Sequence, residues 1–504
     1  MATAVVEERQ LLKSMRWWDG FAIALCQPGF LIFSLLGAYG ALGVLGATVL
    51  WGIAAIVALL SVWVYSEPAM MFPGRSGGIS LYANEAWRKY TTLVGPIATF
   101  GYWIGWSVVL AIIGNLIGSL IQAQWFSSST WTVYDGVVHL GLFNFIGIGA
   151  VVLVWLFNVF GIRPFKGFTY VTGVLMIIPL AVLMFGPLIA GDWHSSNVHW
   201  ALANHAWGGV KIALVWLFLM AWSANGIEVC ATFTPEYKEK RDSTIALRSA
   251  GTFSLLVYIL LPLGLGGYTG VPSSAAILSY STYVTTLNHL VGTGATDVLL
   301  CFLIMSLLLS MSTSTADAGR ALYGISRAGL TIKWLGKINR YHVPGNAMTV
   351  DLVVNTCLIL FISNNLGILY MSNIGYVLCH VFAMSGFLLL RKDRPNWPRP
   401  LKLSGFWVGM AVCLLIYDIV ILVVGAGAPH LNGYGNWSDF IIGVGVLAVA
   451  VALFFYRRIV EDKEHVHWKE ETPTMPEGAD RDALIQVGWT PEGTTAAAAP
   501  APVS

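Results

Sequence analysis

Long apolar runs separated by short polar segments dominate this chain between residues 18 and 457. A helix that crosses a membrane needs about 20 predominantly apolar residues. The runs show no two-residue alternation of the kind that marks a barrel strand, so each one predicts a helix. The twelve predicted spanning helices are 18–43, 47–71, 95–124, 139–160, 167–190, 209–235, 249–270, 297–325, 348–365, 368–390, 404–426 and 438–457.

The first predicted helix is interrupted at Cys26, Gln27, Pro28 and Gly29. Pro28 removes a backbone donor and clashes with the preceding turn, and Gly29 adds little helix preference. Backbone groups freed inside a membrane are tolerated only where they face protein or a water-lined cavity. The interruption is therefore a candidate binding site.

A second interruption falls in the sixth predicted helix, where Ser223, Asn225, Gly226 and Glu228 follow a strongly apolar run. A carboxylate at that depth is costly and marks a functional site by default. The structural alternative is a hydrogen bond from Glu228 to a neighbouring helix. The two interruptions lie five helices apart, as an inverted repeat of five helices requires. Such a pair is the best sequence-level indication of a secondary transporter's binding site.

The predicted fold is therefore an all-α integral membrane bundle of twelve transmembrane helices, built as a 5+5 inverted repeat plus two extra helices. The end of the chain is charged and then rich in Pro, Gly, Thr and Ala, a composition typical of a disordered tail. The predicted divisions are an N-terminal segment at 1–17, a transporter domain at 18–458 (repeats at about 18–190 and 209–390, extra helices at 404–457) and a disordered tail at 459–504.

Composition and charge support a membrane protein with both termini in the cytoplasm. Only 11% of the residues are charged, against about 25% in soluble domains. Lys and Arg gather in alternate loops, and by the positive-inside rule these loops face the cytoplasm of a plasma or bacterial inner membrane. Lys211 alone lies near the other side. The basic loops contain Arg75, Arg88, Lys89, Arg163, Lys166, Lys238, Lys240, Arg241, Arg248, Arg327, Lys333, Lys337, Arg340, Arg391, Lys392, Arg394, Arg399 and Lys402.

Two rival classes of membrane protein lack their expected signals. An enzyme needs a converging nucleophile and base or a set of metal ligands, and the sequence contains no Cys/His cluster. A channel is expected to show rings of repeated polar residues, and none recurs. We therefore predict a carrier for a small molecule, embedded in the lipid bilayer, without catalytic residues, a metal or a nucleic-acid partner.

Three motifs resemble the amino acid–polyamine–organocation transporter family. PGRSGGISLY at 73–82 resembles the family's P-x-S-G-G-x-Y loop, and GRALYGISRAG at 319–329 with VPGNA at 343–347 resembles its R-x-x-Y and V-P motifs. WSANGIEVCAT at 222–232 is similar to stretches of the arginine/agmatine and the glutamate/γ-aminobutyrate exchangers. The resemblance implies a LeuT-like fold and an amino acid permease that works as a symporter or exchanger by alternating access.

The resemblance also implies a substrate held near the membrane midplane between the two interruptions. Family members hold the substrate carboxylate at a G-S-G turn, and the matching place here reads Gly29, Phe30, Leu31. Gln27 would offer an amide instead. This difference keeps a second substrate class open, a polyamine, decarboxylated amine or other organic solute. The predicted substrate-binding residues are Gln27, Pro28, Gly29, Phe30, Tyr102, Trp106, Asn115, Trp222, Ser223, Ala224, Asn225, Gly226 and Glu228.

Substrate transport is predicted to be coupled to the movement of a proton or a sodium ion, and no cofactor is expected. Glu228 either attracts a cationic group of the substrate or takes up a proton during transport, and its place matches the exchangers' glutamate. Sodium-coupled relatives use hydroxyls on the eighth helix, where this chain has Ser312 and Thr313.

We also expect specific roles for Trp222 and Asp317. Trp222 falls where the arginine/agmatine exchangers place a substrate-stacking tryptophan, and the alternative is a packing role. Asp317, one turn before Arg320, is expected to be its ion-pair partner.

Overall fold

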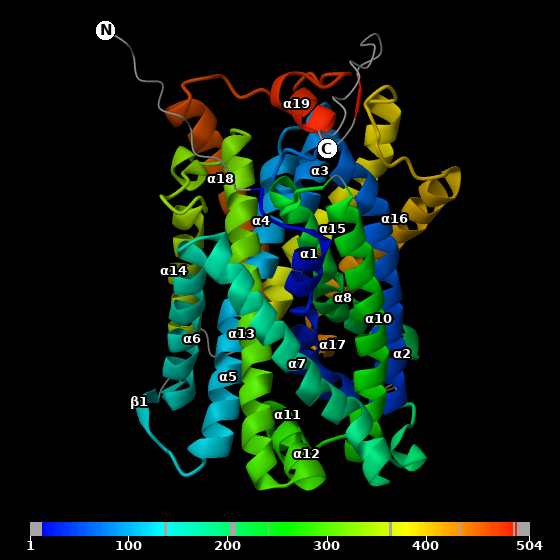
Figure 1. Cartoon of the computed structure of the whole chain (residues 1–504), viewed down its shortest axis with the longest axis vertical. Helices are drawn as coiled ribbons and strands as arrows, with labels where there is room; N and C mark the ends of the chain where they lie inside the picture. Colours follow the sequence, from blue (N-terminus) through cyan, green and yellow to red (C-terminus); the bar gives the residue numbers. More distant parts are fainter. Residues whose placement is uncertain are drawn as a thin grey trace, which may run out of the picture.

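The computed structural model describes residues 13–135, 139–201, 208–239, 241–361, 365–432, 435–486 and 489–490. Within these residues the chain is an upright bundle of long helices (Figure 1). In the described part of the chain, ten helices are long and apolar enough to span a membrane. The first of them, Trp17–Met71, has 55 residues, enough for two spans, and the non-helical backbone of Gly43 (φ 70°, ψ 168°) divides it. With the shorter apolar helix Gly345–Phe361, these make up the twelve predicted spans.

The elements of the first predicted repeat are α1 (Trp17–Ala24), α2 (Gln27–Met71), α3 (Gly78–Trp87), α4 (Val94–Ser107), α5 (Val109–Trp125), the hairpin strands β1 (Thr132–Asp135) and β2 (His139–Gly141), α6 (Leu142–Val159), α7 (Ile162–Ala190) and the 3₁₀ turn η1 (Ser195–Asn197).

The second predicted repeat contains α8 (Gly208–Ala224), η2 (Asn225–Glu228), α9 (Val229–Thr232), η3 (Thr234–Glu236), α10 (Asp242–Thr269), α11 (Ser274–Ser279), α12 (Ser281–Val291), α13 (Thr293–Arg327), η4 (Lys333–Gly336), α14 (Gly345–Phe361) and α15 (Asn365–Asp393). The chain continues with α16 (Gly405–Ala426), α17 (Pro429–Asn432), α18 (Trp437–Tyr456), the π-helical turn η5 (Arg457–Glu461) and α19 (Gly478–Gln486).

The helix boundaries follow the apolar runs closely, with one informative difference. The predicted seventh helix begins at residue 249, whereas α10 begins at Asp242 and includes the polar residues before the run. Asp242 accepts a hydrogen bond from the backbone N–H of Glu239 (3.1 Å), and a carboxylate in the first turn also favours the helix dipole. The helix therefore extends beyond the apolar segment that a hydropathy pattern detects.

Close helix contacts at glycines hold the bundle together. A Cβ on Gly101 of α4 would lie 2.3 Å from the carbonyl oxygen of Gly375 in α15. Small residues allow this approach, and dispersion contacts rather than a hydrophobic difference then stabilise the pair in lipid. The peripheral helices expose apolar side chains instead, for example Val174 in α7, Val423 in α16 and Ile441 in α18. Such an exterior is expected of a bundle surrounded by lipid.

A buried cluster of charges lies at the end of the bundle where Figure 1 shows α3 and α19, called here the α3 end. The carboxylate of Glu85 in α3 is 1% exposed and contacts Arg75 (2.6 Å), Arg88 (3.2 Å) and Arg394 (2.8 Å). Burial by itself raises the pKa of Glu85, but the three guanidinium groups outweigh it and hold this pKa below its ordinary value. The glycine-rich loop therefore leads into a charged, packed helix rather than an open turn.

The tail differs from the prediction of disorder after residue 459. Within the described part of the tail, α19 packs on the α3 end, where Asp480 accepts two hydrogen bonds from Arg75 (2.8 and 2.5 Å) and Leu484 is fully buried. The buried Leu484 and the ion pair between Asp480 and Arg75 stabilise this short helix, although the composition of the tail does not favour order. Residues 487, 488 and 491–504 lie outside the described residues.

Candidate functional site

The interruption of the first helix is a tightened turn rather than an unwound segment. Leu25 and Cys26 separate α1 from α2, yet both keep right-handed helical angles (φ −62° at each). The Cys26 N–H donates to the carbonyl of Ile23 (3.2 Å), three residues back, as in a 3₁₀ helix. Pro28 lies in the first turn of α2, where a missing N–H costs nothing. The predicted break is present, but its backbone stays coiled.

Side chains from other helices satisfy the carbonyls of this turn. The Ser310 hydroxyl of α13 donates to the Cys26 carbonyl (2.7 Å), and the Tyr258 hydroxyl of α10 lies 3.2 Å from the Gln27 carbonyl. A Cβ on Gly29 would lie 2.2 Å from the Ser310 oxygen, so glycine is required for this approach. The first interruption is therefore held between α10 and α13.

The sixth helix is interrupted in the same way. After Ala224 the chain forms the 3₁₀ turn η2, which contains Asn225, Gly226 and Glu228, all buried. A Cβ on Gly226 would lie 2.4 Å from Nε2 of Gln27 and 3.3 Å from both Phe30 and Trp106. The two interruptions therefore face one another at Gly226, where the absence of a side chain allows the close approach. This proximity brings together residues about 200 positions apart in the sequence.

Glu228 is the first of two buried carboxylates beside the interruptions. Its Oε1 accepts hydrogen bonds from the Tyr376 hydroxyl (2.5 Å) and from Trp106 Nε1 (3.2 Å). Its Oε2 is buried and has no hydrogen-bond partner among the described residues. Half of the carboxylate is thus available to a further donor.

Asp317 of α13 is the second buried carboxylate, and the expected ion pair with Arg320 is wrong. Arg320 instead forms a two-pronged pair with Glu236 (Nε–Oε1 2.5 Å, Nη2–Oε2 3.1 Å). Oδ1 of Asp317 accepts from the Tyr102 hydroxyl (3.2 Å), and its buried Oδ2 has no partner in the described structure. The Tyr102 hydroxyl also lies 3.2 Å from Oγ1 of Thr232 in α9, which places Asp317 at the second interruption.

Aromatic rings pack beside the two interruptions. Phe30 lies between Trp106 and Trp222, with ring centroids 5.6 and 5.2 Å apart. Trp222 is buried and donates from Nε1 to the carbonyl of Gly105 (2.8 Å), so it is fixed to α4. Tyr102 stacks obliquely with Tyr376 (6.1 Å), which connects the surroundings of the two carboxylates. The site is a polar centre with an aromatic wall.

Two predicted residues are placed elsewhere. Asn115 lies along α5 and accepts from Asn144 of α6 (3.4 Å), away from both interruptions. The Ser312 hydroxyl accepts from Asn158 of α6 (2.9 Å). Thr313, in contrast, donates to the Ile23 carbonyl (3.4 Å) at the first interruption. The structure brings the remaining predicted residues together, namely Gln27, Pro28, Gly29, Phe30, Tyr102, Trp106, Trp222, Ser223, Ala224, Asn225, Gly226 and Glu228.

Sequence reasoning missed two tyrosines of the site. The Tyr258 hydroxyl is 2.9 Å from Oε1 of Gln27 and 2.7 Å from Oγ of Ser223, so it connects the two interruptions. Tyr376 binds Glu228. Each lies within a long apolar helix, and only the packing of the bundle directs it to the site. No local pattern distinguishes them from interface tyrosines.

Comparison with known proteins gives a family match over most of the chain. A family model described as amino acid permease matches residues 15–451. An arginine/ornithine antiporter of Lactococcus lactis is 24% identical over 449 residues, 81% of this chain and 88% of the antiporter. An amino-acid permease of Bacillus subtilis is 25% identical over 328 residues (62% and 65% of the two chains). A gamma-aminobutyric acid permease of Escherichia coli is 22% identical over 310 residues (58% and 60%).

Proposed function

Because this chain belongs to the amino acid permease family and is a multi-pass membrane transporter of amino acids, we propose that its substrate is a cationic amino acid. One observation carries the proposal. The carboxylates of Glu228 and Asp317 are buried beside the two interruptions, and each keeps one oxygen without a partner among the described residues. A substrate ammonium or guanidinium group would donate to both.

The energetic argument is that a buried carboxylate in a membrane is costly unless a cation or a proton accompanies it. Arg320, the cation nearest to Asp317 in sequence, is already held by Glu236. The described ion pairs give neither Glu228 nor Asp317 a cationic partner. A cationic substrate supplies that partner only while it is bound, which makes binding strong and selective. One of the relatives is an arginine/ornithine antiporter, which supports a cationic substrate carried by exchange.

The substrate carboxylate needs a donor at the other end of the site. Nε2 of Gln27 is buried without a partner among the described residues, while its Oε1 is fixed by Tyr258. We assign this amide to the substrate carboxylate, in place of the family's glycine-rich turn. The rings of Phe30, Trp106 and Trp222 then enclose the aliphatic stem. Each group of a basic amino acid thereby has a complementary group in the site.

Coupling follows from the same charge argument. When the substrate leaves, Glu228 takes up a proton, so that the empty site returns without an isolated buried charge. A state with bound substrate and a state with bound proton then differ in their preference for the outward-open and inward-open forms, as alternating access requires. Sodium would instead occupy the turn where Thr313 contacts the Ile23 carbonyl (3.4 Å). Transport without sodium, but dependent on pH, is therefore expected.

The orientation is proposed from the basic loops. Arg75, Arg88 and Arg394 meet at the α3 end, and Lys and Arg are favoured on the cytoplasmic side. The α3 end then faces the cytoplasm, in a plasma or bacterial inner membrane. Accessibility of single cysteines to a membrane-impermeant thiol reagent tests this orientation.

Counterflow in proteoliposomes tests the substrate proposal. Vesicles loaded with arginine, ornithine, leucine, glutamate or γ-aminobutyrate are each diluted into labelled arginine, with and without sodium. Arginine and ornithine should drive uptake, and Glu228→Gln and Asp317→Asn should each reduce it about tenfold or more, as loss of a charge-assisted hydrogen bond implies. The matched control, Asp297→Asn, changes an aspartate outside the site at the far end of α13 and should transport normally. Failure of vesicles loaded with arginine or ornithine to take up labelled arginine would refute a cationic substrate.

A further inference from the structure

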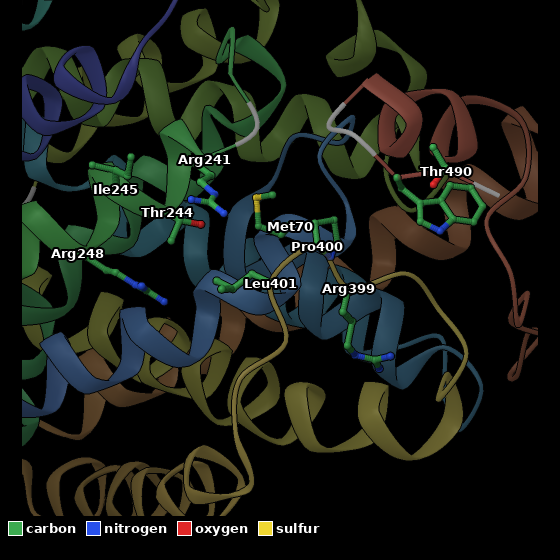
Figure 2. A pocket seen from close by; sticks show the side chains of 10 residues that line it. Met70, Arg241, Thr244, Ile245, Arg248, Arg399, Pro400, Leu401 and Thr490 are labelled. Atoms are coloured by element: carbon green, nitrogen blue, oxygen red, sulfur yellow. The ribbon is translucent and has the colours of Figure 1, made fainter. Parts of the chain in front are cut away.

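A cavity lined in part by arginines lies at the α3 end of the bundle, separate from the interruptions. It has a volume of about 630 Å³ and lies between the start of α10, the end of α2 and the segment that leads into α16. Figure 2 shows Arg241, Thr244 and Arg248 extending from one helix toward Met70 and Leu401. The cavity is large enough for a small ligand or a lipid headgroup.

Three polar residues, from α10 and the position before it, line this cavity, and each has a donor atom without an acceptor among the described residues. Positions 241, 244 and 248 share one helix face because they are spaced by three and four residues. Thr244 is 8% exposed, and its hydroxyl has no partner among the described residues. Nε of Arg248 is likewise buried and unpartnered in the described structure. The exposed side chain of Arg241 has no hydrogen bond or ion pair with any described residue.

Arg248, one of the residues that line the cavity, is held in place by aromatic rings. The Arg248 guanidinium stacks on Trp63 (3.8 Å to the ring centroid), and Trp63 stacks in parallel on Trp407 (5.3 Å, 2°). Nη2 of Arg248 lies 3.4 Å from the Ser66 hydroxyl. A guanidinium fixed in this way presents a planar fork, the geometry that suits a phosphate or carboxylate.

Nearby acidic residues are directed to other partners. Glu239 pairs with Arg16 (2.7 Å), and Asp242 accepts from the Glu239 N–H (3.1 Å). On the opposite wall Arg399 pairs with Glu67 (3.1 Å), but Glu67 also pairs with Arg391 (2.5 Å). Two guanidinium groups thus share one carboxylate, and the wall keeps a positive charge. Among the described residues that line the cavity there are arginines but no Asp or Glu.

We propose that this cavity binds a phosphate-type anion, supplied either by an acidic phospholipid headgroup or by a soluble phosphate. The guanidinium groups of Arg241 and Arg248 and the hydroxyl of Thr244 are its donors. Ile245, 42% exposed, and Leu401 lie beside them and offer an apolar contact for a lipid chain. In the proposed orientation the site faces the inner leaflet, where anionic lipids attract basic segments. A bound anion would connect α2, α10 and the segment before α16.

Thermal unfolding of the delipidated full-length protein in detergent tests this site. Three additives are compared: phosphatidylglycerol, phosphatidylcholine with the same acyl chains, and inorganic phosphate. A rise in the unfolding temperature with phosphatidylglycerol but not phosphatidylcholine identifies a lipid headgroup. A rise with inorganic phosphate identifies a soluble anion. Both results support the anion site.

The variants make the assignment specific. Arg241→Gln changes an exposed side chain and should leave folding intact, while the half-maximal additive concentration rises about tenfold or more. Arg248→Gln and Thr244→Val should act in the same direction. Arg340→Gln, an exposed arginine on the loop between η4 and α14, is the matched control and should respond as the parent does. No stabilisation by any anion, or an equal response of Arg241→Gln and the parent, would overturn the proposal.

Discussion

Replacement of Gly226 by alanine separates the role of the site from the stability of the fold. The new methyl group would lie 2.4 Å from Nε2 of Gln27, about 1 Å closer than an ordinary contact. The amide is the end of a flexible side chain and can move away, but its Oε1 then loses the 2.9 Å hydrogen bond from Tyr258. That loss costs about 1 kcal/mol. Removal of a helical glycine returns up to about 1 kcal/mol, so the net stability should hardly change.

Transport should respond differently from stability. If the Gln27 amide binds the substrate carboxylate, its displacement removes a charge-assisted hydrogen bond of about 1.5–3 kcal/mol. Gly226→Ala should therefore raise the half-saturating arginine concentration by about 10- to 100-fold. The assay is counterflow in proteoliposomes, alongside thermal unfolding of the same preparation.

Gly101→Ala is the matched control. Its methyl group would lie 2.3 Å from the Gly375 carbonyl, and a backbone atom cannot move aside without separating α4 from α15. Overpacking of this kind costs about 1–3 kcal/mol, so Gly101→Ala should unfold at a lower temperature. The reasoning is refuted if Gly226→Ala loses as much stability as Gly101→Ala, or if it transports arginine with an unchanged half-saturating concentration.

Three further predictions concern single contacts. Glu85→Gln leaves the buried Arg394 unpaired and should cost about 3–5 kcal/mol of stability at pH 7. Because the pKa of Glu85 is lowered, its contribution to stability is present at neutral pH and is lost as the pH falls below about 4. The unfolding temperatures of parent and variant should therefore converge at low pH. A difference in unfolding temperature that stays constant with pH would contradict this. Tyr376→Phe removes a hydrogen-bond donor to Glu228 (2.5 Å) and should reduce arginine uptake about tenfold, while the unfolding temperature stays nearly constant. Normal uptake by this variant would exclude a role of the Tyr376 hydroxyl in transport. Asp480→Asn weakens the ion pair that attaches α19 to Arg75 and should speed limited proteolysis of the tail without slowing transport. An unchanged cleavage rate would show that packing alone keeps α19 in place.

Much of the fold was predictable because hydropathy alone defines a spanning helix. The predicted run at 404–426 corresponds to α16 at Gly405–Ala426, and the paired interruptions do meet in the bundle. The form of the interruptions was not predictable. Pro28 and Gly226 indicate a break, but they do not show whether the backbone unwinds or tightens. Here 3₁₀ turns keep both helices coiled.

Contacts between distant helices account for what the sequence could not reveal. Asp317 lies three residues before Arg320, a spacing that favours a local pair, yet Glu236 offers Arg320 both carboxylate oxygens and binds it instead. Asp317 is thereby left to the site. Tyr258 and Tyr376 reach the site only through the packing of α10 and α15. The order of α19 likewise depends on a partner, Arg75, more than 400 residues away.

The central claim is that unpaired buried carboxylates between two tightened helices select a positively charged amino acid. The most direct test is the ratio of arginine uptake to citrulline uptake, because citrulline has nearly the same shape and lacks the charge. The parent protein should prefer arginine by about tenfold or more, and Glu228→Gln should bring the ratio close to one. Equal uptake of the two compounds by the parent, or a ratio unchanged in Glu228→Gln, would contradict the claim.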